Sequence, residues 1–474
     1  MMSANLLGQK RVPIREKRLH SISAYYGEIA PLLKEYAEGG PAQRIRTYAQ
    51  TGADDIQQAV RFASLVEKAA VVIHGPRGCA ARAVYDAARR GVFPRVAVTA
   101  LNERDTITGS EKKLRQSILA LHDAVRPEFI FVILAPVVAI HNDDVLAVAR
   151  ELEAERGVVV VPIPTDGFKS KNSLTGLDVA AHALFRFLPV DEESQPREES
   201  VNVLVLDHQQ KDVREMTRLL AALGLSVNVL PRELDRHFRK ARRARLSISL
   251  DPDAGAYFGN LLEERFGVPW IAAAPPIGTE GVHRWLAAVG GALGRTAEAE
   301  ALHQRELMAW KLDGKGEALA GRSVYVSLPT TQAWAVARLC ASFGANLCGL
   351  SVDHLDSTHE KLIREMAESF PALSLHVGGG QLLEEASIVN KLKPDLYLGH
   401  SAGAAQAARL GVPSLSMEHR AIAGYAGPLW FLSASRKALL SPALARRLGE
   451  KSRPPYGEGW YRKSAHWFIK LEVK

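Results

Sequence analysis

The sequence is poor in cysteine and contains no long apolar run. Its 474 residues include three cysteines, too few for a disulfide framework, so we expect a reducing, cytoplasmic environment. No stretch of 18 or more apolar residues is free of charges, which argues against a membrane-spanning helix. The basic N-terminal segment, residues 1–20, lacks the apolar run and the small-residue cleavage site of a secretory signal.

The sequence also lacks a strong charge of either sign. Its 60 Lys and Arg exceed its 52 Asp and Glu by a formal net charge of +8, which is a small excess for this length. Hydrophobic residues make up 47% and charged residues 24%, values that exclude a disordered or collagen-like chain. We therefore expect a folded protein of about three domains that binds neither nucleic acid nor a membrane.

Short β-branched runs alternate with amphipathic helical patterns along the chain. Near-continuous apolar runs of this kind are typical of buried parallel strands. They are expected at residues 70–73, 129–134, 158–162, 201–206, 226–230, 323–327, 346–350 and 395–398, with helices at 111–124, 144–155, 211–223, 256–266, 331–343 and 359–369. The alternation predicts an α/β protein built from doubly wound, Rossmann-like parallel sheets.

Breaks in this pattern divide the chain. A charged, proline-containing stretch at 191–200 indicates a linker, and a polar segment at 312–321 separates two later blocks. The later blocks share one order, a strand, a helix ending in Leu-Gly or Phe-Gly, and a second strand; generic Rossmann-like architecture is the alternative to a repeated unit. The predicted segments are an N-terminal extension (1–59), Rossmann-like domains (60–195, 196–318 and 319–430) and a C-terminal extension (431–474).

A glycine-rich turn with the sequence HGPRGCA occupies residues 74–80, directly after an expected strand. A cysteine on such a turn is well placed to bind a metal or cluster, because backbone N–H groups stabilise the thiolate. Gly78 and Cys79 are therefore candidate cofactor-binding residues, and Cys79 is the candidate metal ligand. An ordinary structural turn is the alternative.

Four further polar segments could carry chemistry. In NERDTITGSEKKL (102–114) we expect a helix cap at Ser110 without the acidic partner of a capping box. The carboxylates in Asn142–Asp144 could bind a metal, but a helix cap is favoured. GGGQLLEEA (378–386) predicts a helix N-terminus open to an anion, without a dinucleotide or Walker pattern. His419 is a candidate ligand or proton donor, with a bystander role as the alternative.

Taken in order, several motifs together resemble the nitrogenase component-1 superfamily over about residues 14–431. They are REKRL, HGPRGC, NERDTITGSEKKL, NDDV, VPIPTDGF, EERFGVPW and EHRAIAGYAG. The order is similar to the alpha-type subunit and its cofactor-assembly scaffold, and GYAG is scaffold-like. The resemblance implies three Rossmann-like domains around a cofactor cleft and a homologous second subunit in a heterotetramer. It also implies an iron–sulfur cluster shared at the subunit interface and an ATP-dependent iron protein that delivers electrons.

Departures from the family pattern concern the metal ligands. Of three interface-cluster cysteines only Cys79 matches, while Ala53 and Ala135 stand near the other two positions. Alanine cannot ligate iron, so we expect a smaller cluster completed by the partner. Cys340 and Cys348, eight residues apart with the second in an apolar strand, indicate buried structural cysteines.

The ligands of the family's catalytic cofactor also differ. Its cysteine is missing from SISLDPDAGAYF (247–258), and one histidine is replaced near Leu177–Asp178. Only His419 falls near the other family histidine, which makes it the candidate catalytic and cofactor-binding residue. A complex iron–sulfur cofactor is therefore expected in the cleft or in the partner, where the catalytic centre would then lie.

The resemblance predicts an oxidoreductase subunit of a nitrogenase-like two-component reductase. Low-potential electrons would pass from the iron protein through the iron–sulfur cluster to a substrate other than dinitrogen, with carbon–sulfur cleavage of methylthio-alkanes as one candidate. Three alternatives stay open: a scaffold for assembly of a complex iron–sulfur cofactor, a cluster-free paralogue, and a generic cofactor-binding Rossmann protein. The missing phosphate-binding fingerprints argue against the last.

Overall fold

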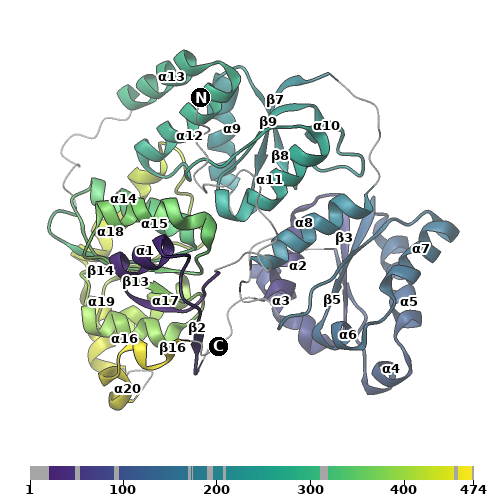
Figure 1. Cartoon of the computed structure of the whole chain (residues 1–474), viewed down its shortest axis with the longest axis horizontal. Helices are drawn as coiled ribbons and strands as arrows, with labels where there is room; N and C mark the ends of the chain where they lie inside the picture. The colour runs from purple at the N-terminus through teal and green to yellow at the C-terminus, as the bar shows by residue number, and fades with distance from the viewer. Residues whose placement is uncertain are drawn as a thin grey trace.

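The chain forms three α/β lobes, each built around its own sheet (Figure 1). The computed structural model describes residues 21–48, 54–89, 95–168, 172, 174–188, 196–206, 210–309, 319–452 and 457–471. The first lobe lies at the right of Figure 1, the second at the top and the third at the lower left. This arrangement confirms the predicted α/β class with parallel, Rossmann-like sheets.

The first lobe has a four-stranded parallel sheet in the order β4-β3-β5-β6. Its strands are β3 (Ala69–His74), β4 (Val96–Val98), β5 (Phe129–Leu134) and β6 (Val160–Ile163). Its helices are α2 (Asp55–Leu65), α3 (Arg77–Arg89), α4 (Glu103–Thr108), α5 (Glu111–Val125), α6 (Pro136–His141), α7 (Val145–Arg156) and α8 (Thr175–Phe187). Val71 and Ile73 of β3 pack into one apolar cluster, whereas Ala70 and Val72 pack into another. Both faces of the sheet are therefore covered, as its continuous apolar runs predict.

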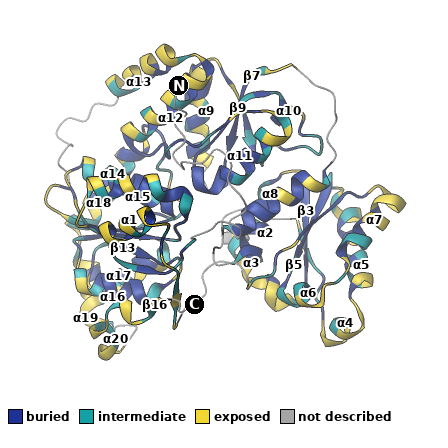
Figure 2. Cartoon of the chain, viewed as in Figure 1, coloured by how far each residue is buried: buried dark blue, intermediate teal, exposed yellow. Residues whose placement is uncertain are grey.

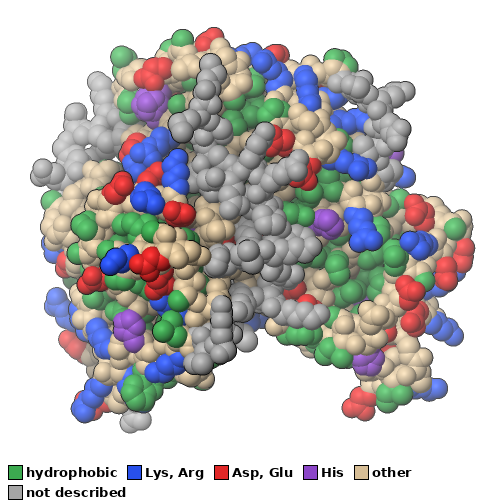
Figure 3. All heavy atoms as spheres, in the orientation of Figure 1, with side chains coloured by type: hydrophobic (Ala, Val, Ile, Leu, Met, Phe, Trp, Pro, Cys, Tyr) green, Lys and Arg blue, Asp and Glu red, His purple; other side chains and the backbone are tan. Residues whose placement is uncertain are grey.

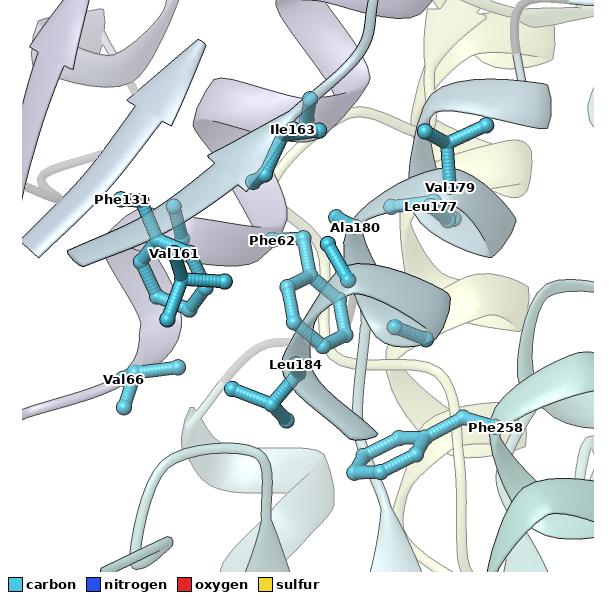
Figure 4. Close-up of a cluster of buried hydrophobic side chains, with 14 of the residues drawn as sticks. Phe62, Val66, Phe131, Val161, Ile163, Leu177, Val179, Ala180, Leu184 and Phe258 are labelled. Atoms are coloured by element: carbon cyan, nitrogen blue, oxygen red, sulfur yellow. The ribbon is translucent and has the colours of Figure 1, made fainter. Parts of the chain in front are cut away.

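The second lobe repeats this plan with the parallel order β10-β9-β7-β8. Its strands are β7 (Glu198–Leu204), β8 (Ser226–Leu230), β9 (Ala244–Ser249) and β10 (Trp270–Ile271). Its helices are α9 (Gln210–Ala222), α10 (Arg239–Arg243), α11 (Pro252–Phe266), α12 (Gly278–Leu293) and α13 (Thr296–Ala309). Helix α11 continues the core of the first lobe, because the centroid of the Phe258 ring lies 5.7 Å from those of Phe62 and Phe185. Figure 4 shows Phe258 and Phe62 within this cluster.

The third lobe has a six-stranded sheet in the order β1-β13-β12-β11-β14-β15. Its strands are β1 (Tyr25–Glu28), β11 (Ser323–Ser327), β12 (Asn346–Val352), β13 (Ser374–Val377), β14 (Leu396–Gly399) and β15 (Ser414–Ser416), and only β1 runs antiparallel to its neighbour. Its helices are α1 (Ile29–Ala37), α14 (Thr330–Ser342), η2 (Ser357–His359), α15 (Glu360–Ser369), α16 (Leu382–Leu392), α17 (Ser401–Arg409), α18 (Gly427–Leu440), α19 (Ala443–Lys451), α20 (Glu458–Arg462) and η3 (Ala465–Trp467). A separate antiparallel pair, β2 (Arg44–Arg46) and β16 (Ile469–Leu471), joins segments from early and late in the chain.

The surface carries mixed charge and the interior of each lobe is apolar. Figure 2 shows buried strands at the centre of each lobe and exposed residues on the outer helices. On the face drawn in Figure 3, acidic and basic side chains of the described residues are interspersed, without a large patch of one sign. None of the described helices combines the length and the apolar character needed to cross a bilayer.

Candidate functional site

Cys79 lies in the first turn of α3, directly after the turn that joins β3 to this helix. Residues Gly75 and Pro76 make the turn, and Cys79 is the third residue of the helix, where its N–H donates to Pro76 O at 3.2 Å. Gly78 and Cys79 are both exposed, and Cys79 is a free thiol. The sequence-predicted ligand therefore stands at the carboxyl end of a parallel strand, open to a partner or cofactor.

The turn is packed tightly against the end of the neighbouring strand. His74 of β3 is in register with Leu134 of β5, so the residues that follow the two strands lie side by side. A Cβ on Gly75 would lie 2.3 Å from the Cβ of Ala135, which is fully buried. Glycine is needed here because no larger residue fits beside Ala135.

The other cysteine positions contribute no ligand to this edge in the described part of the chain. Ala135 precedes α6 and presents a methyl group, and Ala53 lies outside the described residues. Cys340 in α14 and Cys348 in β12 both belong to the third lobe, and burial raises the pKa of both thiols, that of Cys348 to about 11. Cys340 is buried as predicted, whereas Cys348 is only partly buried and its thiol donates to Val324 O at 3.4 Å.

The buried side chain of His74, from the HGPRGCA motif, contacts Ser110 and Asp143 of two other sequence motifs. The Nδ1 of His74 lies 3.1 Å from Thr99 Oγ1, and its Nε2 lies 3.1 Å from Ser110 Oγ and 3.4 Å from Asp143 Oδ2. Thr99 Oγ1 also accepts from the N–H of Gly75 at 2.9 Å. Burial lowers the pKa of His74 to about 4 although the Asp143 carboxylate opposes that shift. His74 is therefore a neutral group that positions the turn.

Ser110 occupies the N-cap position of α5, as the sequence predicts. Its side chain caps no N–H of that helix, however, because its hydroxyl donates to Asp143. The capping box instead lies at Asn102 and Asp105, whose side chains accept each other's N–H at 3.0 and 2.8 Å. Asp144 caps α7 as predicted by accepting the N–H of Ala147 at 2.9 Å.

The glycine-rich segment before α16 does not support the predicted anion site. Glu384 and Glu385 occupy the first turn of α16 and are both buried. Glu384 accepts from Arg46 Nε at 2.8 Å and lies 2.9 Å from His376 Nε2. The positive end of the helix dipole is thus already matched by carboxylates of the chain itself.

The remaining sequence-predicted cofactor residues lie in separate lobes. His419 is exposed in the third lobe, in the loop after β15, and its φ of 56° is left-handed. Leu177 and Asp178, which stand near the position of the other family histidine, are buried in α8 of the first lobe.

A buried cluster of histidines and carboxylates lies between the second and third lobes, and sequence reasoning missed it. Asp251, at the start of α11, caps that helix and accepts from Thr331 Oγ1 of α14 at 2.7 Å. Two residues later, Asp253 Oδ2 lies 3.1 Å from His354 Nε2 and 3.6 Å from His359 Nε2. The repeated Asp and His of DPD (251–253) and DHLDSTH (353–359) were the available sequence signal.

The electrostatics of this cluster follow from its carboxylates. Burial disfavours the charged form of His359, but Asp356 and Asp253 outweigh burial and raise its pKa to about 9. Asp356 Oδ1 lies 3.1 Å from His359 Nδ1, so the imidazole stands between two carboxylates. Without another cation, the cluster is a buried imidazolium–carboxylate network.

Comparison with known proteins agrees with this architecture. The family model for nitrogenase component 1 type oxidoreductases matches residues 57–440. A nitrogenase iron–molybdenum cofactor biosynthesis protein NifE from Methanococcus maripaludis is 25% identical over 397 residues, which cover 78% of this chain and 80% of the relative. A nitrogenase molybdenum–iron protein alpha chain from Methanosarcina barkeri is 30% identical over 226 residues, which cover 45% of this chain and 42% of the relative.

A solved structure shares the fold. The structure described as nitrogenase Cp1 at pH 5 has a TM-score of 0.73 and 20% sequence identity, and the match covers 87% of this chain and 92% of that one. Because the family model spans most of the sequence and the fold agrees, the chain belongs to the nitrogenase component 1 type oxidoreductase family.

Proposed function

We propose that the chain is a scaffold subunit that holds a complex iron–sulfur cofactor during its assembly, together with a homologous second subunit. The observation that carries this proposal is the exposed Cys79, the one thiol that the chain offers at the edge of the first sheet among the described residues. A single exposed ligand holds a cluster only when a partner supplies the others.

The start of α11 supports a carrier rather than a resident cofactor. The family's cofactor cysteine is expected here, but the segment carries Asp251, Pro252 and Asp253. Without a thiolate bond at this point, the cargo is held more weakly and is released more readily. The likeness to a protein named for cofactor biosynthesis over 78% of this chain supports the same function.

The turn residues have distinct parts in this proposal. Cys79, as thiolate, would bind iron of the cargo, and the backbone N–H groups of the first turn of α3 would stabilise its negative charge. Neutral His74 and the close contact of Gly75 with Ala135 fix the turn, so that the thiol is presented in one position. His419 stays a candidate second contact to the cargo.

A nitrogenase-like reductase is the second candidate function. The likeness to a molybdenum–iron protein alpha chain and the oxidoreductase family favour it. In this case the cluster at Cys79 would pass electrons from an ATP-dependent iron protein to a catalytic centre, held mainly by the partner. Reduction of methylthio-alkanes remains one predicted use of such a complex.

One experiment separates the two functions. The chain is purified anaerobically with the proteins that accompany it, and iron, sulfide and electron paramagnetic resonance signals are measured. A scaffold complex transfers its iron once to a component-1 protein that lacks cofactor, and shows no sustained turnover. Repeated ATP-dependent reduction of an added methylthio-alkane without loss of iron would instead establish the reductase.

A further inference from the structure

We propose that Asp253, His354 and His359 bind one first-row divalent transition-metal ion at the boundary between the second and third lobes. Asp253 comes from the first turn of α11, His354 from the loop after β12, and His359 from the end of η2. None of the three is a ligand that the family resemblance implies. The site does not use Cys79, which lies in the first lobe, but Asp253 belongs to the segment at the start of α11 where the family's cofactor cysteine is expected.

The distances between the ligand atoms fit a metal site. One ligand atom from each residue lies within 4.8 Å of the others. Metal–nitrogen and metal–oxygen bonds of about 2.0–2.2 Å place neighbouring ligand atoms of a tetrahedral ion roughly 3.3–3.5 Å apart. The separations of 3.1 and 3.6 Å from Asp253 Oδ2 to the two Nε2 atoms bracket this range. The ion therefore needs little movement of the side chains that bind it.

The imidazole nitrogens of the cluster lack a well-aligned hydrogen bond. His354 Nδ1 and Nε2 and His359 Nε2 are buried without one among the described residues, although the two Nε2 atoms lie 3.1 and 3.6 Å from Asp253 Oδ2. The three ligand residues are each at most 2% exposed. A buried polar atom without a partner costs free energy, and a metal ion would satisfy the two Nε2 atoms at once.

The surroundings of the ligands are those of a metal site. His359 Nδ1 lies 3.1 Å from Asp356 Oδ1 and 3.2 Å from the backbone N of Asp356, and these contacts orient the ring so that Nε2 faces Asp253. Thr330 Oγ1 donates to the carbonyl of His354 at 2.7 Å and fixes that loop. Asp251 Oδ1 caps α11 and accepts from Thr331, whereas Asp253 Oδ2 faces the two imidazole Nε2 atoms.

Charge and donor type define the ion. The cluster brings the three buried carboxylates of Asp251, Asp253 and Asp356 together with two imidazoles, and a divalent cation would offset their negative charge. Two nitrogens and one carboxylate oxygen suit zinc, and the same donor set binds ferrous iron. Because the ligands come from two lobes, the ion would fasten α11 to the third lobe.

The test uses Co²⁺ as the probe on the full chain, in a Cys79→Ala background that removes the exposed thiol. Protein freed of metal by a chelator is titrated, and we expect one Co²⁺ per chain with the visible absorption of a site of low coordination number. His354→Gln and His359→Gln should abolish this binding, and Asp356→Asn should weaken it about 10- to 100-fold. Competition with Zn²⁺ and Fe²⁺ then identifies the preferred ion.

The matched control is His376→Gln. His376 is also buried in the third lobe, but both of its ring nitrogens already have partners, Ser351 and Glu384. This variant should keep one Co²⁺ per chain. If a histidine variant fails to fold, thermal unfolding tests the site instead. Co²⁺ should raise the thermal midpoint of the parent protein, and this rise should be absent in Asp253→Asn. Absence of binding to the folded parent protein, or binding unchanged in the ligand variants, would overturn the site.

Discussion

Cys79 and the Asp253–His354–His359 cluster present metal-binding atoms in opposite ways. Cys79 is exposed in the first turn of α3, and the chain supplies one ligand there among the described residues. The cluster is fully buried, and its three ligand atoms converge from two lobes. An exposed single ligand needs a partner before it can hold a metal, whereas a converged set is preorganised by the fold of one chain.

The largest effect is expected on the metal content of the complex when the thiol of Cys79 is removed. Cys79→Ala should abolish the iron and sulfide of the purified complex, because no second cysteine stands near it in the described residues. Its free energy of unfolding should change by less than about 0.5 kcal/mol, since the side chain is exposed. Cys348→Ala is the control and should retain the iron. Unchanged iron in the Cys79 variant would refute its role as a ligand.

The packing under the turn offers the next largest effect. Gly75→Ala should destabilise the chain by about 1–3 kcal/mol, because the added methyl lies 2.3 Å from the Cβ of Ala135. The reverse change, Ala135→Gly, should recover part of the loss when combined with it. Gly78→Ala is a matched control, since nothing lies within 4 Å of its Cβ. Urea unfolding gives the free energy of unfolding of the two single glycine variants, of Ala135→Gly and of the double variant. Equal stability of Gly75→Ala and Gly78→Ala would contradict the close contact.

The pH dependence of stability sharpens the comparison further. The pKa of His74 is lowered from 6.5 to about 4, so the unfolded chain takes up a proton between these values that the folded chain does not. Stability is therefore complete above pH 6.5 and falls toward pH 4, by up to about 1.4 kcal/mol per pH unit.

Unfolding in urea between pH 7 and 5 tests this effect. His74→Gln should remove that part of the slope, whereas the same change at His122, which lies partly exposed on α5, should not. A slope that is identical in the parent protein and in His74→Gln would show that other groups cause the acid loss.

The smallest effect on stability is expected at His419. His419→Ala should change the free energy of unfolding by less than about 0.5 kcal/mol from that of the parent protein. The side chain is exposed, and alanine at this left-handed φ carries a backbone strain similar to that of histidine. It should nevertheless lower cofactor retention or turnover. His419→Gly separates backbone from side chain, since glycine relieves the strain but also lacks the imidazole. Parent-level metal content and rates in both variants would make His419 a bystander.

Much of the fold followed from local patterns. The apolar runs at 129–134, 226–230 and 323–327 predict both ends of their strands correctly, because the sheets bury these strands on both faces. The sequence does not predict β9 and β13, because polar residues interrupt the apolar ones in ARLSIS and SLHV. These polar side chains are buried with hydrogen-bond partners, as in the contact between Ser351 and His376. β1 depends on pairing with β13, which no local pattern records.

The candidate sites show the same limit. The HGPRGC turn could be recognised because its residues are contiguous, and the structure places it at a strand end as expected. The metal-binding cluster could not, because its ligands are about a hundred residues apart and come from different lobes. Ser110 illustrates a third case, in which a tertiary partner, Asp143, competes with the local helix cap for one hydroxyl.

The pairing of β1 with β13 has a consequence for synthesis of the chain. Tyr25 leaves the ribosome early, yet its partner Val377 is made only after the first two lobes are complete. The edge of the third sheet, and the β2–β16 pair beside it, must therefore form late, after the intervening lobes have had time to fold as units. Residues 25–46 are thus synthesised early but pair with strands that are synthesised late. A chain that ends before residue 374 would leave β1 without its strand partner.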